Sequence, residues 1–175
     1  MNSRIVAAAV ALAALVTIGC TRDTPAAPPP GPDGWHTFDG AWSATGTRHT
    51  LPIDAAGRIA AIVQLAGAVA ITTDDWIGRG FRGELIGFND GQTHSVGRWQ
   101  WTDDRGDRVF GDVGGDPMQG GGRFVGTITG GSGRYAGISG QVEFVWQYFV
   151  EADDGVVQGR ATGIKGRYRR GGARP

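Results

Sequence analysis

The sequence has 175 residues, of which 32 are glycine, and it carries 17 basic and 17 acidic side chains. A formal net charge of zero excludes a broadly basic nucleic-acid binder, because such proteins carry a marked excess of Lys and Arg. Since 40% of the residues are hydrophobic, the chain can bury a core despite its glycine content. The length suits one domain with short appendages, and it is too short for an α/β barrel of ~250 residues.

The first element along the chain is a targeting segment. Residues 5–18 form an apolar run that follows Arg4 and leads into Gly19 and Cys20. Because a bilayer span needs ~20 apolar residues, this shorter run is typical of a signal-peptide core. Residues 15–20 resemble the bacterial lipoprotein signal, in which a small residue precedes a cysteine that is acylated and becomes the mature N-terminus. The alternative is a chance cysteine beside an ordinary cleavage site.

Cys20 is the single cysteine of the chain, so an intramolecular disulfide is impossible. Acylation of Cys20 would anchor the protein to a membrane face without spanning the membrane. We therefore expect a lipoprotein signal peptide over 1–19 and a Pro/Ala-rich tether over 20–34. Five of the eight prolines lie in the tether, so it should be extended and partly stiff. These features predict an exported lipoprotein that is anchored to a membrane of the bacterial cell envelope.

From Trp35 onward, short β-branched or aromatic segments alternate with Gly/Asp clusters, which is typical of an all-β domain. The short connections predict antiparallel neighbours. We expect an eight-stranded antiparallel up-and-down β-barrel over 35–170 and a flexible tail over 171–175, because closure removes exposed sheet edges. A two-sheet sandwich is the alternative. The predicted strands lie near 35–45, 58–72, 80–88, 94–102, 107–113, 122–129, 137–150 and 156–169.

The longest apolar run after the signal extends from Ile59 to Ile71. Its Ile and Val content, with Gly67 inside it, favours a strand, and a buried helix is the alternative. Both faces of such a strand would be apolar, and a strand of this kind is covered on both faces. We therefore expect a second layer or another subunit, as in a homo-oligomer, against the alanine-rich face.

A glycine-rich segment over 126–140 is the most distinctive motif. It contains Gly131-x-Gly133-x-x-Ala136, which matches a dinucleotide fingerprint, but a β-rich segment follows where that fingerprint requires a helix. The residues from Gly130 to Tyr135 resemble a turn of the allene oxide cyclase and dirigent protein superfamily. That resemblance implies an eight-stranded antiparallel barrel. Family members include cyclases and proteins that direct stereochemistry without chemistry of their own, and no catalytic residue can be transferred to this chain.

Side chains on the predicted strands supply two groups of candidate site residues. An aromatic and apolar group would line a cavity for a small hydrophobic ligand or simply fill the core. A polar group would orient such a ligand if it pointed inward, or form solvated cross-strand pairs if it pointed outward. Trp76, on a polar loop, would cap the barrel or touch a partner. The first group is Trp99, Trp101, Val142, Phe144, Trp146 and Tyr148, and the second is Arg82, Glu84, Arg98 and Glu143.

The three histidines have no ligand-like spacing, and the aspartates near Gly106 do not match a calcium loop, so the sequence predicts no metal and no cofactor. Three hypotheses on function remain. The protein is a tethered barrel that binds a small hydrophobic ligand or a partner, a cyclase or isomerase acting on a small apolar substrate, or a purely structural envelope lipoprotein. The size and lining of the barrel interior would distinguish them.

Overall fold

The computed structural model describes residues 34–74, 76–91, 94–116 and 121–171. The predicted signal peptide lies outside the described residues. So do the predicted tether and tail, apart from Gly34 and Gly171.

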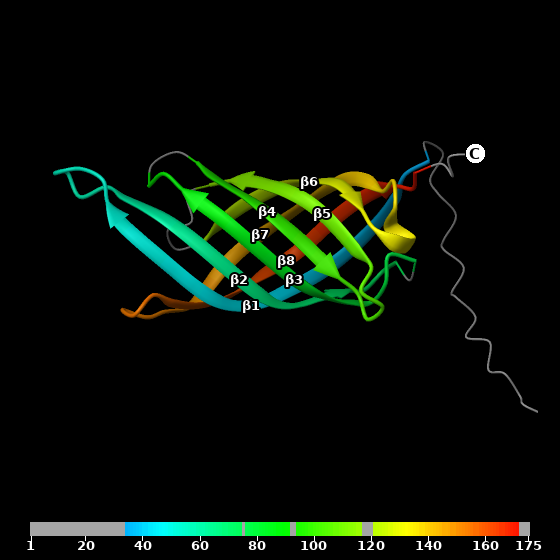
Figure 1. Ribbon diagram of the computed structural model, residues 1–175, viewed down its shortest axis with the longest axis horizontal. Coiled ribbons are helices and arrows are strands. Elements are labelled where there is room, and N and C mark those ends of the chain that lie inside the picture. The colour runs from blue at the N-terminus through cyan, green and yellow to red at the C-terminus, as the bar shows by residue number, and fades with distance from the viewer. Residues whose placement is uncertain (1–33, 75, 92–93, 117–120, 172–175) are drawn as a thin grey trace, which may run out of the picture.

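Eight antiparallel strands form a closed barrel in which each strand pairs with its neighbours in sequence and β1 pairs with β8 (Figure 1). This confirms the predicted up-and-down barrel and excludes the sandwich. The predicted strand positions are correct, although β1 continues several residues beyond its expected end. The strands are β1 (His36–Pro52), β2 (Ile59–Ile71), β3 (Gly80–Asn89), β4 (Ser95–Thr102), β5 (Arg108–Gly115), β6 (Gly122–Gly131), β7 (Ser139–Glu151) and β8 (Val156–Arg169).

The two ends of the barrel differ. The β1–β2 and β7–β8 hairpins extend beyond the other strands at one end (Figure 1). At the opposite end lie the start of β1, the end of β8 and a short 3-10 helix, η1 (Gly133–Tyr135). This second end is called the chain-end face below, because the described chain both enters and leaves the barrel there.

The segment Ile59–Ile71 is strand β2, so the helical alternative is wrong. Gly67 lies so close to β1 that an added Cβ would come within 1.9 Å of the Ser43 carbonyl oxygen, which explains the glycine. The outer face of β2 is not covered within the described chain, since Ile62 there is 55% exposed. The expected second layer is therefore wrong, and a second subunit on this face stays a prediction.

Alternation along the strands directs most of the tryptophan side chains and several other aromatic side chains into the barrel. The inward face predicted for residues 137–150 is confirmed, because Val142 and Trp146 are buried while Phe144 and Tyr148 pack partly buried against the core. The rings contact one another, both within one strand and between strands. Trp99 and Trp101 lie 4.7 Å apart between ring centroids, and Trp42 lies 5.2 Å from Trp146.

The loop between β2 and β3 closes the barrel at the chain-end face. Asp74 on this loop is only 2% exposed, and its Oδ1 accepts hydrogen bonds from the backbone N–H groups of Trp76 (2.8 Å) and Ile77 (3.3 Å). Its Oδ2 accepts a hydrogen bond from the Tyr168 hydroxyl at 2.8 Å. Trp76 stacks on the Tyr168 ring with centroids 5.2 Å apart. Trp76 therefore caps the barrel, which is one of the two roles predicted for it.

The glycine-rich motif supplies the other half of this closure. Tyr135, in η1, is completely buried, and its hydroxyl lies 2.7 Å from the Ile77 carbonyl oxygen, to which it donates. Arg134 donates to the same carbonyl oxygen at 3.2 Å and forms an ion pair with Asp103 at 3.2 Å. Burial raises the pKa of Tyr135 above its ordinary value of 10.0, so the phenol stays neutral and can donate. The motif therefore fastens the β2–β3 loop over the barrel end.

Candidate functional site

The barrel interior bounded by described residues is almost filled. The cavity between Trp42, Phe124, Phe144 and Trp146 has a volume of about 20 Å³. Such a space holds about one water molecule, whereas ligand pockets usually measure ~300–1,000 Å³. The candidate cavity-lining residues of β4 and β7 lie inside the barrel, but they pack as core rather than around a ligand-sized space.

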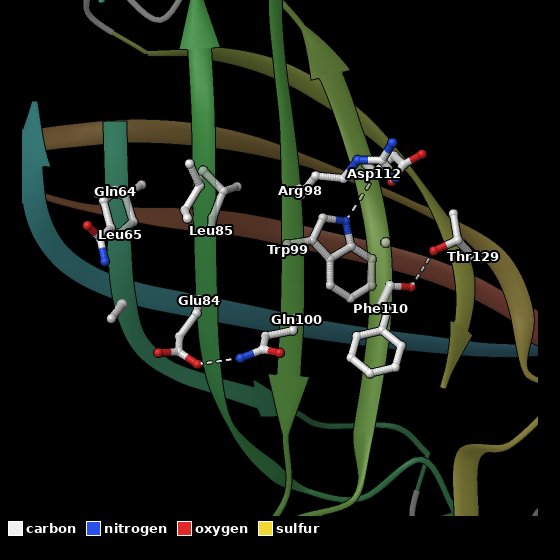
Figure 2. Close-up of a pocket in the computed structure, with 13 residues that line it drawn as sticks. Gln64, Leu65, Glu84, Leu85, Arg98, Trp99, Gln100, Phe110, Asp112 and Thr129 are labelled. Atoms are coloured by element: carbon white, nitrogen blue, oxygen red, sulfur yellow. Dashed lines mark hydrogen bonds and ion pairs between the residues drawn. The ribbon is translucent and has the colours of Figure 1, made fainter. Parts of the chain in front are cut away.

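A hollow on the outside of the barrel, across strands β2 to β6, is much larger than this interior cavity and is called the outer groove below (Figure 2). Its volume is about 460 Å³. Its lining residues are Gln64, Leu65, Ala66, Glu84, Leu85, Ile86, Arg98, Trp99, Gln100, Phe110, Gly111, Asp112 and Thr129.

Two rows of outward side chains form the walls of the outer groove, and strand register sets both. One row crosses neighbouring strands from Ile86 to Arg98 and Asp112, and the other runs through Glu84, Gln100 and Phe110. The row between them turns its side chains inward, so its backbone forms the floor. That row consists of Leu65, Leu85, Trp99 and Gly111.

A β-bulge shapes the β5–β6 side of the outer groove. Phe110 pairs with Gly130 and Gly111 with Ile128, which leaves Thr129 as the extra residue of β6. Its hydroxyl donates to the Phe110 carbonyl oxygen at 3.3 Å (Figure 2). Bulges of this kind change the direction of side chains and are frequent beside functional sites.

Gly111 lets the Trp99 ring lie directly beneath the outer groove. A Cβ at position 111 would lie 2.1 Å from Cζ2 of Trp99, which is closer than any real contact. The indole N–H donates to the Asp112 carbonyl oxygen at 3.1 Å (Figure 2). Trp99 is therefore both a core residue and part of the groove floor.

The four polar candidate residues point outward, which is the second of the two orientations considered in the sequence analysis. Arg82 bonds Glu84 at 2.8 Å, and Arg98 is paired with Asp112. Glu143 lies on the outer face of β7, opposite Val125 and Lys165. Glu84 and Arg98 belong to the outer groove, Arg82 borders it through its bond to Glu84, and Glu143 lies on another part of the surface.

Glu84 is held as a carboxylate. The hydrogen bond donated by the Gln100 amide at 2.7 Å, together with the positive charge of Arg82, lowers the pKa of Glu84 below its ordinary value of 4.5. At neutral pH this group accepts hydrogen bonds and carries a negative charge. It is suited to binding a donor group and not to supplying a proton.

A second hollow of about 550 Å³ adjoins the outer groove and shares Ile86, Arg98 and Asp112 with it. Its lining is mainly apolar. Ile62, Phe88 and Val96 project into solvent there, with exposed fractions between 45% and 55%. Register places Phe88 opposite both Ile62 and Val96, so the three side chains form one continuous row across β2 to β4.

Sequence reasoning found Glu84 and Arg98 but missed Gln100, Phe110, Asp112 and Thr129 as neighbours. Their strand spacing would have placed them on one outer face. The bulge at Thr129, however, has no signal in the sequence beyond the flanking glycines.

Within the described residues there is no group of three or more His, Cys, Asp or Glu side chains that could hold a metal ion. The described part of the chain likewise contains no helix long and apolar enough to cross a membrane. Comparisons with protein-family models, with curated proteins and with solved structures find no match. The resemblance of residues 130–135 to the allene oxide cyclase and dirigent superfamily stays a prediction.

Proposed function

We propose that the protein is a membrane-tethered β-barrel lipoprotein of the bacterial cell envelope that binds a partner protein through its outer groove. This proposal rests on the difference in volume between the interior of the barrel and the groove on its outer surface. The interior cavity that described residues bound measures about 20 Å³ and has no room for a ligand, whereas the outer groove offers about 460 Å³. Binding therefore takes place outside the barrel.

The chemistry of the outer face suits a protein partner. The groove combines an ionised Glu84 and a Gln100 amide with the half-buried ring of Phe110. The neighbouring row of Ile62, Phe88 and Val96 is apolar and exposed. Contiguous exposed apolar side chains bordered by polar groups are typical of protein interaction surfaces.

The support for a membrane tether comes from the sequence. The apolar run over 5–18, the single Cys20 and the proline-rich segment that follows all support export and acylation. A cyclase or isomerase would need a site that excludes water. Because the outer groove is open to solvent, we do not propose that activity.

A purely structural envelope lipoprotein is the second candidate, and the filled interior favours it. The two candidates differ in what the outer groove does. A structural barrel has no specific partner there, whereas a binding module contacts one partner in a defined orientation.

The tether is tested by fractionating cells that express the full chain or its Cys20→Ala variant. The full chain should stay with the membranes after a wash in concentrated salt, and Cys20→Ala should be released. Retention of Cys20→Ala after that wash would contradict the lipid anchor.

The groove is tested by placing a photo-crosslinking amino acid at Gln100 and, as a matched control, at Gln158. Both glutamines lie on outward faces, but Gln158 is on β8 and outside the groove. The proposal expects one discrete crosslinked species from position 100 and none from position 158. Equal or absent crosslinking at the two positions would favour the structural barrel. A crosslinked species that contains only a second copy of this chain would identify the partner as another subunit.

A further inference from the structure

The outer groove is too narrow for a helix. Its two wall rows lie two residues apart on each strand, which separates their backbones by about 7 Å at the rise of a β-strand. An α-helix with its side chains is about 10 Å across and cannot enter between the rows. A single extended chain can enter, because neighbouring chains in a sheet lie only about 4.8 Å apart. The width of the groove therefore favours an extended occupant.

The outer groove runs across the strands and not along them. It extends from β2 to β6, so it passes over four gaps between neighbouring strands (Figure 2). At about 4.8 Å for each gap the floor is about 19 Å long, and an occupant outside the barrel follows a wider arc than the floor. Since an extended chain covers about 3.3 Å per residue, the groove takes about six to nine residues.

The floor of the groove cannot bind a peptide as an added strand, because such binding needs an exposed sheet edge. The barrel is closed, and the floor row is paired on both sides. Leu85 pairs with Leu65 and Trp99, and Trp99 pairs in turn with Gly111. The backbone groups of the floor are therefore engaged within the sheet. Recognition of an occupant falls to the side chains of the walls.

Two glutamines of the walls offer groups that match a peptide backbone. The Gln100 amide donates one hydrogen bond to Glu84 at 2.7 Å, and its other N–H and its carbonyl oxygen have no partner among the described residues. The exposed Gln64 side chain likewise makes no hydrogen bond within the described chain. A glutamine amide carries donors and an acceptor, as a peptide group does, so Gln64 and Gln100 can each pair with the backbone of an occupant.

Phe110 provides an apolar contact at the β5 end of the groove. Its ring lies beside Gln100 on the same wall and is half-buried (Figure 2). An apolar side chain of the occupant that covers this ring removes the rest of its surface from water, which stabilises the complex.

The charged side chains around the groove are present with both signs. Glu84 bonds Arg82 at 2.8 Å, and Arg98 is paired with Asp112. Arg108 adds a further positive charge that acts on Glu84. The groove therefore does not select an occupant by its net charge. Its shape and its two amides carry the recognition.

We propose that the partner enters the outer groove as an extended segment of about six to nine residues that crosses the barrel from β2 to β6. Its peptide groups bond Gln64 and Gln100, and one of its apolar side chains covers Phe110. This inference deepens the proposed function and rests on it. Extended segments are recognised elsewhere in the same way, through backbone hydrogen bonds and a few side-chain contacts.

The test maps the occupant by photo-crosslinking from three positions of the full chain, each in a separate variant. Ala66, Gln100 and Thr129 line the groove on β2, β4 and β6, and Gln158 on β8 is again the control. Mass spectrometry identifies the crosslinked residues of the partner. An extended segment predicts that all three lie in one stretch of about ten residues or fewer. They should follow the order of positions 66, 100 and 129, or its reverse.

A synthetic peptide with the sequence of this stretch then tests the backbone contacts. We expect it to compete with the crosslink from position 100. Methylation of its backbone nitrogen at the residue crosslinked from position 100 should weaken its binding to the full chain about fivefold, because a hydrogen bond is lost. Gln100→Leu should weaken binding of the unmodified peptide by a similar factor, whereas the matched control Gln158→Leu should bind as the parent does.

Crosslinks scattered over the sequence of the partner would overturn the inference, because they indicate a folded surface, and so would a peptide that does not compete. Either result would leave the outer groove as the binding site. The absence of a discrete crosslinked species from all three groove positions would overturn both the inference and the proposed function.

Discussion

Asp74 should be one of the most sensitive polar positions of the barrel. Replacing it with alanine removes the acceptor for the backbone N–H groups of Trp76 and Ile77 and for the hydroxyl of Tyr168. Each buried group that loses its partner destabilises the fold by about 1–3 kcal/mol. The three together predict a loss of at least about 3 kcal/mol for Asp74→Ala, which is a large part of the stability of an ordinary domain.

Urea unfolding measures this loss through the midpoint, provided that the slope stays unchanged. Asp74→Asn is the graded control. It keeps an oxygen for the two backbone N–H groups but places its NH2 group toward Tyr168, where that group cannot accept the hydroxyl proton, so we expect a loss of about 1–2 kcal/mol. If Asp74→Ala costs less than about 1 kcal/mol, the β2–β3 loop does not fasten the barrel end and the reasoning is refuted.

Two further predictions concern the groove floor and the tyrosines. Gly111→Ala should destabilise the fold by about 1–3 kcal/mol in urea unfolding, because its Cβ would overlap the Trp99 ring. Gly80→Ala, where nothing lies within 4 Å, is the control, and equal effects would contradict the packing beneath the groove. Burial raises the pKa of Tyr135, Tyr148 and Tyr168 above 10.0. The stability that this shift contributes is present below pH 10 and is lost as the pH rises beyond it, so phenolate absorbance should appear only as the barrel unfolds. Phenolate absorbance in a still-folded barrel would refute this prediction.

Local chemistry was enough to predict the strands. The Asp-Gly turn at 154–155 and the alternation along 137–150 indicated both the hairpin and its inward face, because a strand has a period of two. For the outer face of β2 the apolar residues predicted a second layer or another subunit, and within the described chain no second layer is present. An apolar outward side chain such as Ile62 does not reveal whether anything covers it.

Contacts between distant residues were beyond sequence reasoning. The hydrogen bond between Asp74 and Tyr168 joins residues 94 positions apart, and no local pattern couples a polar loop to the last strand. The outer groove likewise depends on the register of five strands and on the bulge at Thr129. A one-residue change of register would send the groove walls to the opposite face.

The central claim is that the barrel binds its partner on the outside, in the outer groove. The most direct measurement compares the affinity of Ala66→Arg and Gln158→Arg for the partner crosslinked from position 100. Each substitution adds one arginine to an outward face, but only position 66 lies in the groove. We expect Ala66→Arg to weaken binding at least ~10-fold, or about 1.4 kcal/mol, while Gln158→Arg binds as the parent does. Equal affinities for the two folded variants would contradict the assignment of the outer groove as the binding site.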